Sequence, residues 1–170
     1  MLACLCPGLH TTARNFVLAM SGINEHDVTI AEILKKAGYA TGIFGKWGLG
    51  NPDTAGMPLK KGFDEFYGYL DHVHAHYRFP LFLYDQDKEE PFPTNTGPEP
   101  WMNPDGVDAE VRFHQKALDF LDRRLESPQP FFLNMMYTTP HADNLVSTEY
   151  MKPYMGQPQL PSFLPSFQSH

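Results

Sequence analysis

A glycine-rich segment that holds a single lysine is the first candidate for chemistry in this sequence. It reads GKWGLG over residues 45–50, with Lys46 and Trp47 between the glycines. Glycines let backbone N–H groups approach a ligand closely, and the lysine adds a compact positive charge, so the segment suits a small oxyanion. It does not match the phosphate loop GxxxxGK followed by Ser or Thr, which disfavours a nucleotide. A glycine-rich turn with a solvated lysine is the alternative that these residues alone leave open.

A histidine that follows an apolar segment is the second candidate. His141 comes directly after Pro140, where the apolar run 131–137 ends in a polar turn. An imidazole in this position can protonate a leaving group or donate a hydrogen bond to an anion. An ordinary loop histidine with a structural hydrogen bond is the other interpretation.

Alternating histidines form the third candidate. His72, His74 and His76 would lie on one face of an extended segment, as a transition-metal site requires. The aromatic neighbours instead favour a substrate rim with weak contacts from His74, His76 and Trp47; these neighbours are Tyr69, Tyr77 and Phe79. We therefore assign no metal ligand. The acidic residues are scattered along the chain, and no GxSxG elbow or other nucleophile is recognisable.

Two helix-then-strand units carry these candidates. Thr29 and Glu32 have the spacing of a capping box, which predicts a helix over 29–37 with an apolar stripe at Ile30, Ile33 and Leu34. A buried strand is expected over 39–44.

The second unit is a helix that starts at Asp105 or Asp108 and a strand over 131–137. The stripe expected on that helix contains Val111, Leu118, Leu121 and Leu125, widened by Phe113, Ala117 and Phe120. Such units predict an α/β fold with a mainly parallel sheet and flanking helices. Functional groups collect at the carboxyl ends of parallel strands, so residues 45–50 and 138–141 should form two walls of one site.

Composition narrows the classes of partner. The 170 residues are 42% hydrophobic and 14% aromatic, with a mean hydropathy of −0.38, which is typical of a globular domain. Lys plus Arg number 13 against 20 Asp plus Glu, a net charge of −7, which excludes nucleic acid as an expected partner. No apolar run reaches the length of a membrane span, and the N-terminus lacks the basic region of a signal peptide. Cys4 and Cys6 are too close together to form a disulfide framework.

Three segments together closely resemble the sulfatase family, in particular bacterial arylsulfatase-like proteins. They are TIAEILKKAGYATGIFGKWGLG at 29–50, KKGFDEFYGYLDHVHAHY at 60–77 and PFFLNMMYTTPHADN at 130–144. The resemblance implies part of an alkaline-phosphatase-like sandwich over residues 1–153, followed by a tail rich in Pro and Ser over 154–170. A loop is expected over 91–104.

The resemblance also implies roles for particular residues. Lys46 matches the lysine of the family's GKW motif, which contacts the sulfate, and His141 matches the PH histidine, which contacts the sulfate or the leaving oxygen. Sulfatases hydrolyse sulfate esters with a formylglycine made from Cys or Ser and with a calcium ion. The implied partner is a small sulfate ester or a sulfated glycan. Family members are often periplasmic or secreted, but this sequence shows no signal peptide, so we assign no compartment.

Departures from the family pattern limit what is carried over. Many members have His two places after the lysine, where this chain has Gly48. GLHTTAR at 8–14 resembles the segment after the modified CxPSR motif, but neither cysteine has the Ser-Arg that this motif requires. The calcium ligands and the second lysine of the family would lie outside residues 1–170. We therefore expect a sulfuric ester hydrolase by resemblance, inactive or weak as this chain. The alternatives are a noncatalytic sulfate-binding or anion-binding remnant and a phosphoester hydrolase of the same superfamily.

Overall fold

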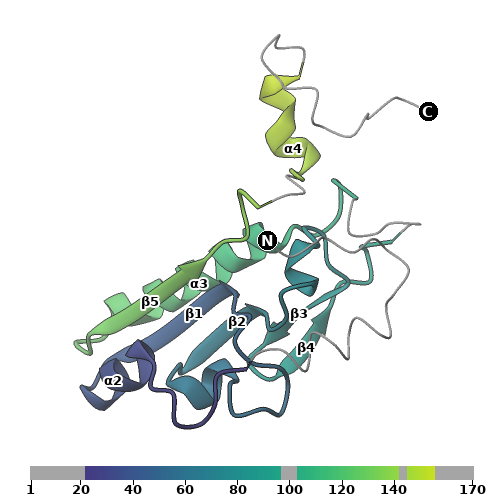
Figure 1. Cartoon of the computed structure of the whole chain (residues 1–170). Helices are drawn as coiled ribbons and strands as arrows, with labels where there is room; N and C mark the ends of the chain where they lie inside the picture. The colour runs from purple at the N-terminus through teal and green to yellow at the C-terminus, as the bar shows by residue number, and fades with distance from the viewer. Residues whose placement is uncertain (1–21, 97–102, 142–144, 156–170) are drawn as a thin grey trace.

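The computed structural model describes residues 22–96, 103–141 and 145–155. Within them lies one five-stranded sheet in the order β4-β3-β2-β1-β5 (Figure 1). Its strands are β1 (Ala40–Lys46), β2 (Glu65–Tyr69), β3 (Phe82–Asp85), β4 (Lys88–Pro91) and β5 (Phe131–Met136). Several sequence expectations fall outside the described residues: both cysteines, the GLHTTAR segment and most of the tail.

Helices cover both faces of the sheet. The α-helices are α2 (Ile30–Lys36), α3 (Ala109–Leu125) and α4 (Thr148–Met151), and the 3-10 helices are η1 (Pro58–Lys61), η2 (His74–His76) and η4 (Lys152–Tyr154). One buried cluster joins α3 to the sheet through Phe44 and Tyr67, and another joins α2 to the opposite face through Ile43 and Phe66. The described residues contain no helix with the length and apolar character that a membrane crossing requires. The α/β prediction is confirmed.

The sheet is mixed. β1 lies between β2 and β5 and runs parallel to both, whereas β3 and β4 form an antiparallel hairpin beside β2. Sequence patterning did not predict this hairpin, because its turn passes through Gln86 at φ 61° instead of the Asn-Gly or Asp-Gly pair that usually marks such a turn.

Helix α2 begins where the capping box predicts, but its apolar stripe does not face the core. Glu32 N–H donates to the Thr29 hydroxyl at 3.1 Å, and Thr29 N–H donates to the Glu32 carboxylate at 2.7 Å. Ala31 is the residue fully buried, whereas Ile30 and Ile33 are 61% and 57% exposed. The reason is the close approach of Gly62, where a Cβ would lie 2.3 Å from Glu32 N. Only a small side chain such as Ala31 fits the face that meets this backbone.

Helix α3 starts after the N-cap Asp108, one of the two predicted starts. Its buried face contains Phe113, Ala117 and Phe120, while Leu118 and Leu125 of the predicted stripe are 47% and 75% exposed. The aromatic side chains determine which face packs on the sheet because each buries more area than a leucine. Leu118 and Leu125 of the predicted stripe therefore lie outside the face that packs on the sheet. Phe113, Ala117 and Phe120, which widened the predicted stripe, form that face.

A carboxylate holds the start of β1 against the start of β2. The Asp64 carboxylate accepts hydrogen bonds from Thr41 N–H at 2.9 Å and from the Thr41 hydroxyl at 3.0 Å, and it pairs with Lys35 of α2 at 2.7 Å. Burial alone would raise the pKa of Asp64, but the Lys35 and Thr41 contacts outweigh it, so that the net pKa is lowered from 3.8. One side chain thus ties two strands to a helix.

We expect Asp64→Asn to lower the free energy of unfolding by about 1 kcal/mol at neutral pH, because the amide loses the charge-assisted bonds. A lowered folded-state pKa contributes stability above the unfolded pKa, and this contribution is lost as pH falls through the folded pKa. The difference between Asp64→Asn and wild type should therefore shrink below about pH 4. Urea unfolding from pH 7 to pH 3 measures it. Asp119→Asn, an exposed change on α3, is the control; a difference independent of pH would contradict this role.

Candidate functional site

The two predicted walls follow neighbouring strands. Gly45 of β1 is in register with Met136 of β5 on one side and with Gly68 of β2 on the other, and Lys46 is the last residue of β1. Since β1 and β5 are parallel, Lys46 at the end of β1 and the turn after β5 that carries His141 both lie at the carboxyl edge of the sheet (Figure 1). The Lys46 side chain is half-buried, and none of the described residues forms an ion pair with it. Because Lys46 has no carboxylate partner among the described residues, its positive charge is available to an anionic ligand.

Trp47 anchors the loop after β1. Its indole N–H donates to the carbonyl of Gly56 at 2.8 Å, its ring packs edge-on against Phe63 at 5.7 Å, and its side chain is buried. The backbone continues the sheet, because Trp47 N–H donates to the Tyr69 carbonyl at 2.9 Å. The structure thus places Trp47, a predicted substrate contact, in the core on the α2 side.

Gly48 makes room for an imidazole. It has φ +75°, and a Cβ added there would lie 2.4 Å from Cε1 of His72. The His72 ring therefore occupies the space that a side chain at position 48 would need. The sequence pattern grouped His72 with its alternating neighbours and gave no sign of this contact, which joins segments far apart along the chain.

His72, His74 and His76 do not lie in the extended segment that would place all three imidazoles on one face. His74 and His76 lie in the 3-10 helix η2, where residues two apart point in different directions. His74 packs between Tyr69 and Phe82, with ring centroids at 4.9 Å and 4.4 Å. In the part of the chain that the structure describes, no group of three or more His, Cys, Asp or Glu side chains could hold a metal ion. These residues therefore do not fit the calcium site that sulfatases generally contain, since calcium takes six or more oxygen ligands.

His76 instead contacts His141, in the turn after β5. Its ring lies edge-on to the His141 ring, with centroids 4.6 Å apart, and its Nδ1 is 3.2 Å from the Val73 carbonyl. His141 N–H donates to the Thr138 carbonyl at 3.0 Å, which closes the turn after β5. The structure thus brings together one predicted catalytic residue and one predicted substrate contact.

A buried ionic cluster, which sequence reasoning missed, supports this turn. Arg78 Nε lies 2.7 Å from Asp108 Oδ1, and Glu110 accepts a hydrogen bond from Thr138 N–H at 2.7 Å. The neighbouring Tyr69 is held neutral, because burial, together with the charges of Glu110 and Asp108, raises its pKa well above 10.0. Asp108 was recognised only as a candidate N-cap, and nothing in the sequence pattern pointed to Arg78 or Glu110.

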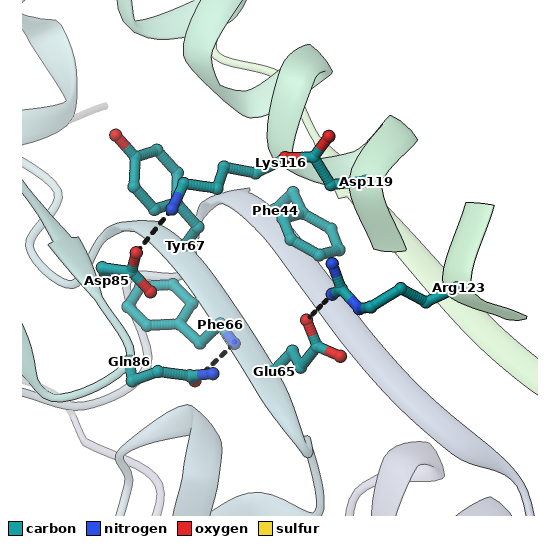
Figure 2. A pocket seen from close by; sticks show the side chains of 9 residues that line it. All are labelled: Phe44, Glu65, Phe66, Tyr67, Asp85, Gln86, Lys116, Asp119 and Arg123. Atoms are coloured by element: carbon teal, nitrogen blue, oxygen red, sulfur yellow. Dashed lines mark hydrogen bonds and ion pairs between the residues drawn. The ribbon is translucent and has the colours of Figure 1, made fainter. Parts of the chain in front are cut away.

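A hollow that the described residues outline lies elsewhere. It measures about 120 Å³ between α3 and the sheet, near Glu65 at the start of β2, the end of that strand opposite the candidate site. Figure 2 shows Lys116 reaching Asp85, at 2.5 Å, and Arg123 reaching Glu65. Because both cations already have carboxylate partners, this hollow offers no free positive charge for an anion.

Comparison with known proteins gives the family. The sulfatase family model matches residues 1–163. N-acetylgalactosamine-6-sulfatase of Canis lupus familiaris is 30% identical over an alignment 170 residues long. The alignment covers 89% of this chain and 30% of that protein. Arylsulfatase G of Homo sapiens is 45% identical over 56 residues, which cover 32% of this chain and 10% of that protein. The chain thus spans about a third of the length of the first curated relatives that it matches.

Solved structures agree in fold. Ps i-CgsB in complex with k-i-k-neocarrahexaose has a TM-score of 0.63 and 23% identity, covering 79% of this chain and 31% of that one. A protein solved in complex with its substrate D-glucosamine-2-N,6-O-disulfate has a TM-score of 0.52 and 24% identity, covering 79% of this chain and 23% of that one. The match over residues 1–163 and the shared alkaline-phosphatase-like fold lead to one conclusion: the chain belongs to the sulfatase family.

Proposed function

We propose that the chain supplies part of the sulfate pocket of a sulfuric ester hydrolase, with Lys46 and His141 as its catalytic contacts. The observation that carries the proposal is the parallel pairing of β1 and β5, which sends the loops of Lys46 and His141 from one edge of the sheet. Lys46, a partly buried residue that forms no ion pair with any described residue, supports it.

The two side chains have complementary tasks in this proposal. Cleavage of a sulfate ester leaves negative charge on the oxygens bound to sulfur and on the departing ester oxygen. The Lys46 ammonium compensates charge on the sulfate oxygens, and it does so more strongly in a partly desolvated site than in water. The His141 imidazolium donates a hydrogen bond or a proton to the departing oxygen. His76 packs against His141 and limits its ring orientations.

A sulfated sugar is the substrate class that we propose. The curated relatives include N-acetylgalactosamine-6-sulfatases, and one solved neighbour holds a disulfated glucosamine as its substrate. Tyr77, which is partly exposed and follows His76 in the sequence, suits the apolar face of a sugar ring, whereas Tyr69 and Phe79 of the expected aromatic rim are buried. Trp47 and His74 would act on the substrate only indirectly, through the loop and the aromatic cluster that they hold in place.

Turnover by this chain alone should be weak or absent. The described residues do not fit a calcium site, and the sequence shows no residue in the family's nucleophile motif. Charge compensation by one lysine and one histidine lowers the barrier but provides no covalent route. Two alternatives follow from the same geometry: a noncatalytic sulfate-binding site, and a site that prefers phosphate esters.

Two measurements on the purified chain with calcium separate these functions: hydrolysis of a chromogenic aryl sulfate, and binding of sulfate and of phosphate. Wild type is compared with Lys46→Ala, His141→Ala and the exposed control Lys36→Ala, and host sulfatase is excluded by a mock purification. Turnover that both site variants lose supports a hydrolase. Sulfate binding without turnover, weakened in both variants, supports the noncatalytic site. Tighter binding of phosphate supports the phosphoester alternative, and a folded chain that binds neither anion overturns the proposal.

A further inference from the structure

A carboxylate beneath the second wall is placed to control the orientation of His141. Glu110 is the second residue of α3, and its side chain is 8% exposed. Its Oε1 accepts hydrogen bonds from Thr138 N–H at 2.7 Å, from the Thr138 hydroxyl and from Thr139 N–H at 3.3 Å. Three donors from two consecutive residues thus converge on one oxygen atom.

The same residue, Thr138, also holds His141. Its carbonyl accepts a hydrogen bond from His141 N–H at 3.0 Å, so Thr138 joins the Glu110 carboxylate on one side to the His141 backbone on the other. The chain between them is short, which leaves the imidazole few ways to move while Thr138 is fixed.

Glu110 is itself held in place. Asp108, the N-cap of α3, accepts a hydrogen bond from Glu110 N–H at 2.9 Å and from Ser147 at 2.6 Å. Arg78 contacts Asp108 at 2.7 Å and lies 3.9 Å from Glu110. The charge of a carboxylate is also favourable in the first turn of a helix. A buried carboxylate with these partners is costly to lose and fixed in position.

We propose that Glu110 is a positioning residue that holds the turn 138–141, and with it the His141 imidazole, in the orientation that meets a sulfate group. The inference rests on the proposed function for the part that concerns sulfate. Glu110 does not touch the substrate. It acts through Thr138, and its essential property is an acceptor oxygen at Oε1, which a glutamine can also present.

NMR of the full chain tests this in Glu110→Ala, Glu110→Gln and the control Glu126→Ala, an exposed change at the far end of α3. The first readout is the nuclear Overhauser effect between the His76 and His141 rings, whose centroids lie 4.6 Å apart. The second is the affinity for inorganic sulfate at the His141 signals. The Trp47 indole N–H, bonded to Gly56, reports on the rest of the fold.

We expect Glu110→Ala to lose the contact between the His76 and His141 rings and to bind sulfate about five- to tenfold more weakly. Glu110→Gln should keep both the contact and the affinity, and the Trp47 indole signal should stay unchanged in both variants. Thr138→Val, which removes only the hydroxyl donor, should fall between them if Glu110→Ala does not fold. Equal losses in the Gln and Ala variants, or a Trp47 signal that shifts with them, would overturn the proposal. A wild-type chain that does not bind sulfate refutes the proposed function, whereas the ring contact still tests the positioning.

Discussion

Gly45→Ala should lower the free energy of unfolding by about 3 kcal/mol or more, because it forces apart the strands that carry the site. Gly45 has φ +121°, and a Cβ there would lie 2.0 Å from the Met136 carbonyl oxygen of β5. Neither the backbone of β1 nor that of β5 can yield without breaking their pairing. Natural domains have total stabilities of about 5–15 kcal/mol, so the loss is a large fraction of the whole.

Gly38→Ala separates the backbone strain from the steric clash. Gly38 also has a positive φ, +89°, but a Cβ there meets nothing within 4 Å. It should cost only about 1 kcal/mol, from conformational strain alone. Urea unfolding of both variants measures the difference. If Gly45→Ala and Gly38→Ala lower the free energy of unfolding equally, the close approach of β1 and β5 is not the reason that position 45 requires glycine.

Lys46→Ala should weaken sulfate binding by about ten- to a hundredfold, which corresponds to the roughly 1.5–3 kcal/mol of a hydrogen bond to a charged group. Lys46 is partly buried and has no counter-ion among the described residues, so its removal takes away the positive charge that would compensate a bound anion there. The stability of the fold should change little, because Lys46 supplies no ion pair to the described part of the chain.

Two matched variants make this result interpretable. Lys46→Arg keeps the charge and should retain most of the affinity, and Lys36→Ala removes an exposed lysine of α2 and should have no effect. Isothermal titration with sodium sulfate at constant ionic strength measures each affinity, because screening would otherwise mask the difference. Equal losses for Lys46→Ala and Lys36→Ala would show that only net charge matters.

Local signals predicted the elements that carry the site. The capping box at Thr29 located the start of α2, and the start of α3 lies at Asp108, one of the two candidates, Asp105 and Asp108. The β1 and β5 strands were predicted as 39–44 and 131–137, and the structure places them at Ala40–Lys46 and Phe131–Met136. These features depend on residues close together in the sequence, which is why their spacing is sufficient to find them.

Contacts between distant segments could not be predicted in this way. The buried face of α2 depends on Gly62 approaching from η1, and the place of His72 depends on the missing side chain of Gly48. Glu110 reaches Thr138 only after α3 has packed on the sheet. The alternating histidines left a metal site open as an alternative, because alternation places side chains on one face only in an extended strand, and here the backbone turns into η2.

Amide chemical-shift mapping of the chain during a sulfate titration tests whether Lys46 and His141 line one sulfate site. We expect the amides of residues 45–48 and 138–141 to shift together with a single dissociation constant, while those around the hollow of Figure 2 do not move. Separate dissociation constants for the two loops, or shifts centred on Lys116 and Arg123, would contradict it.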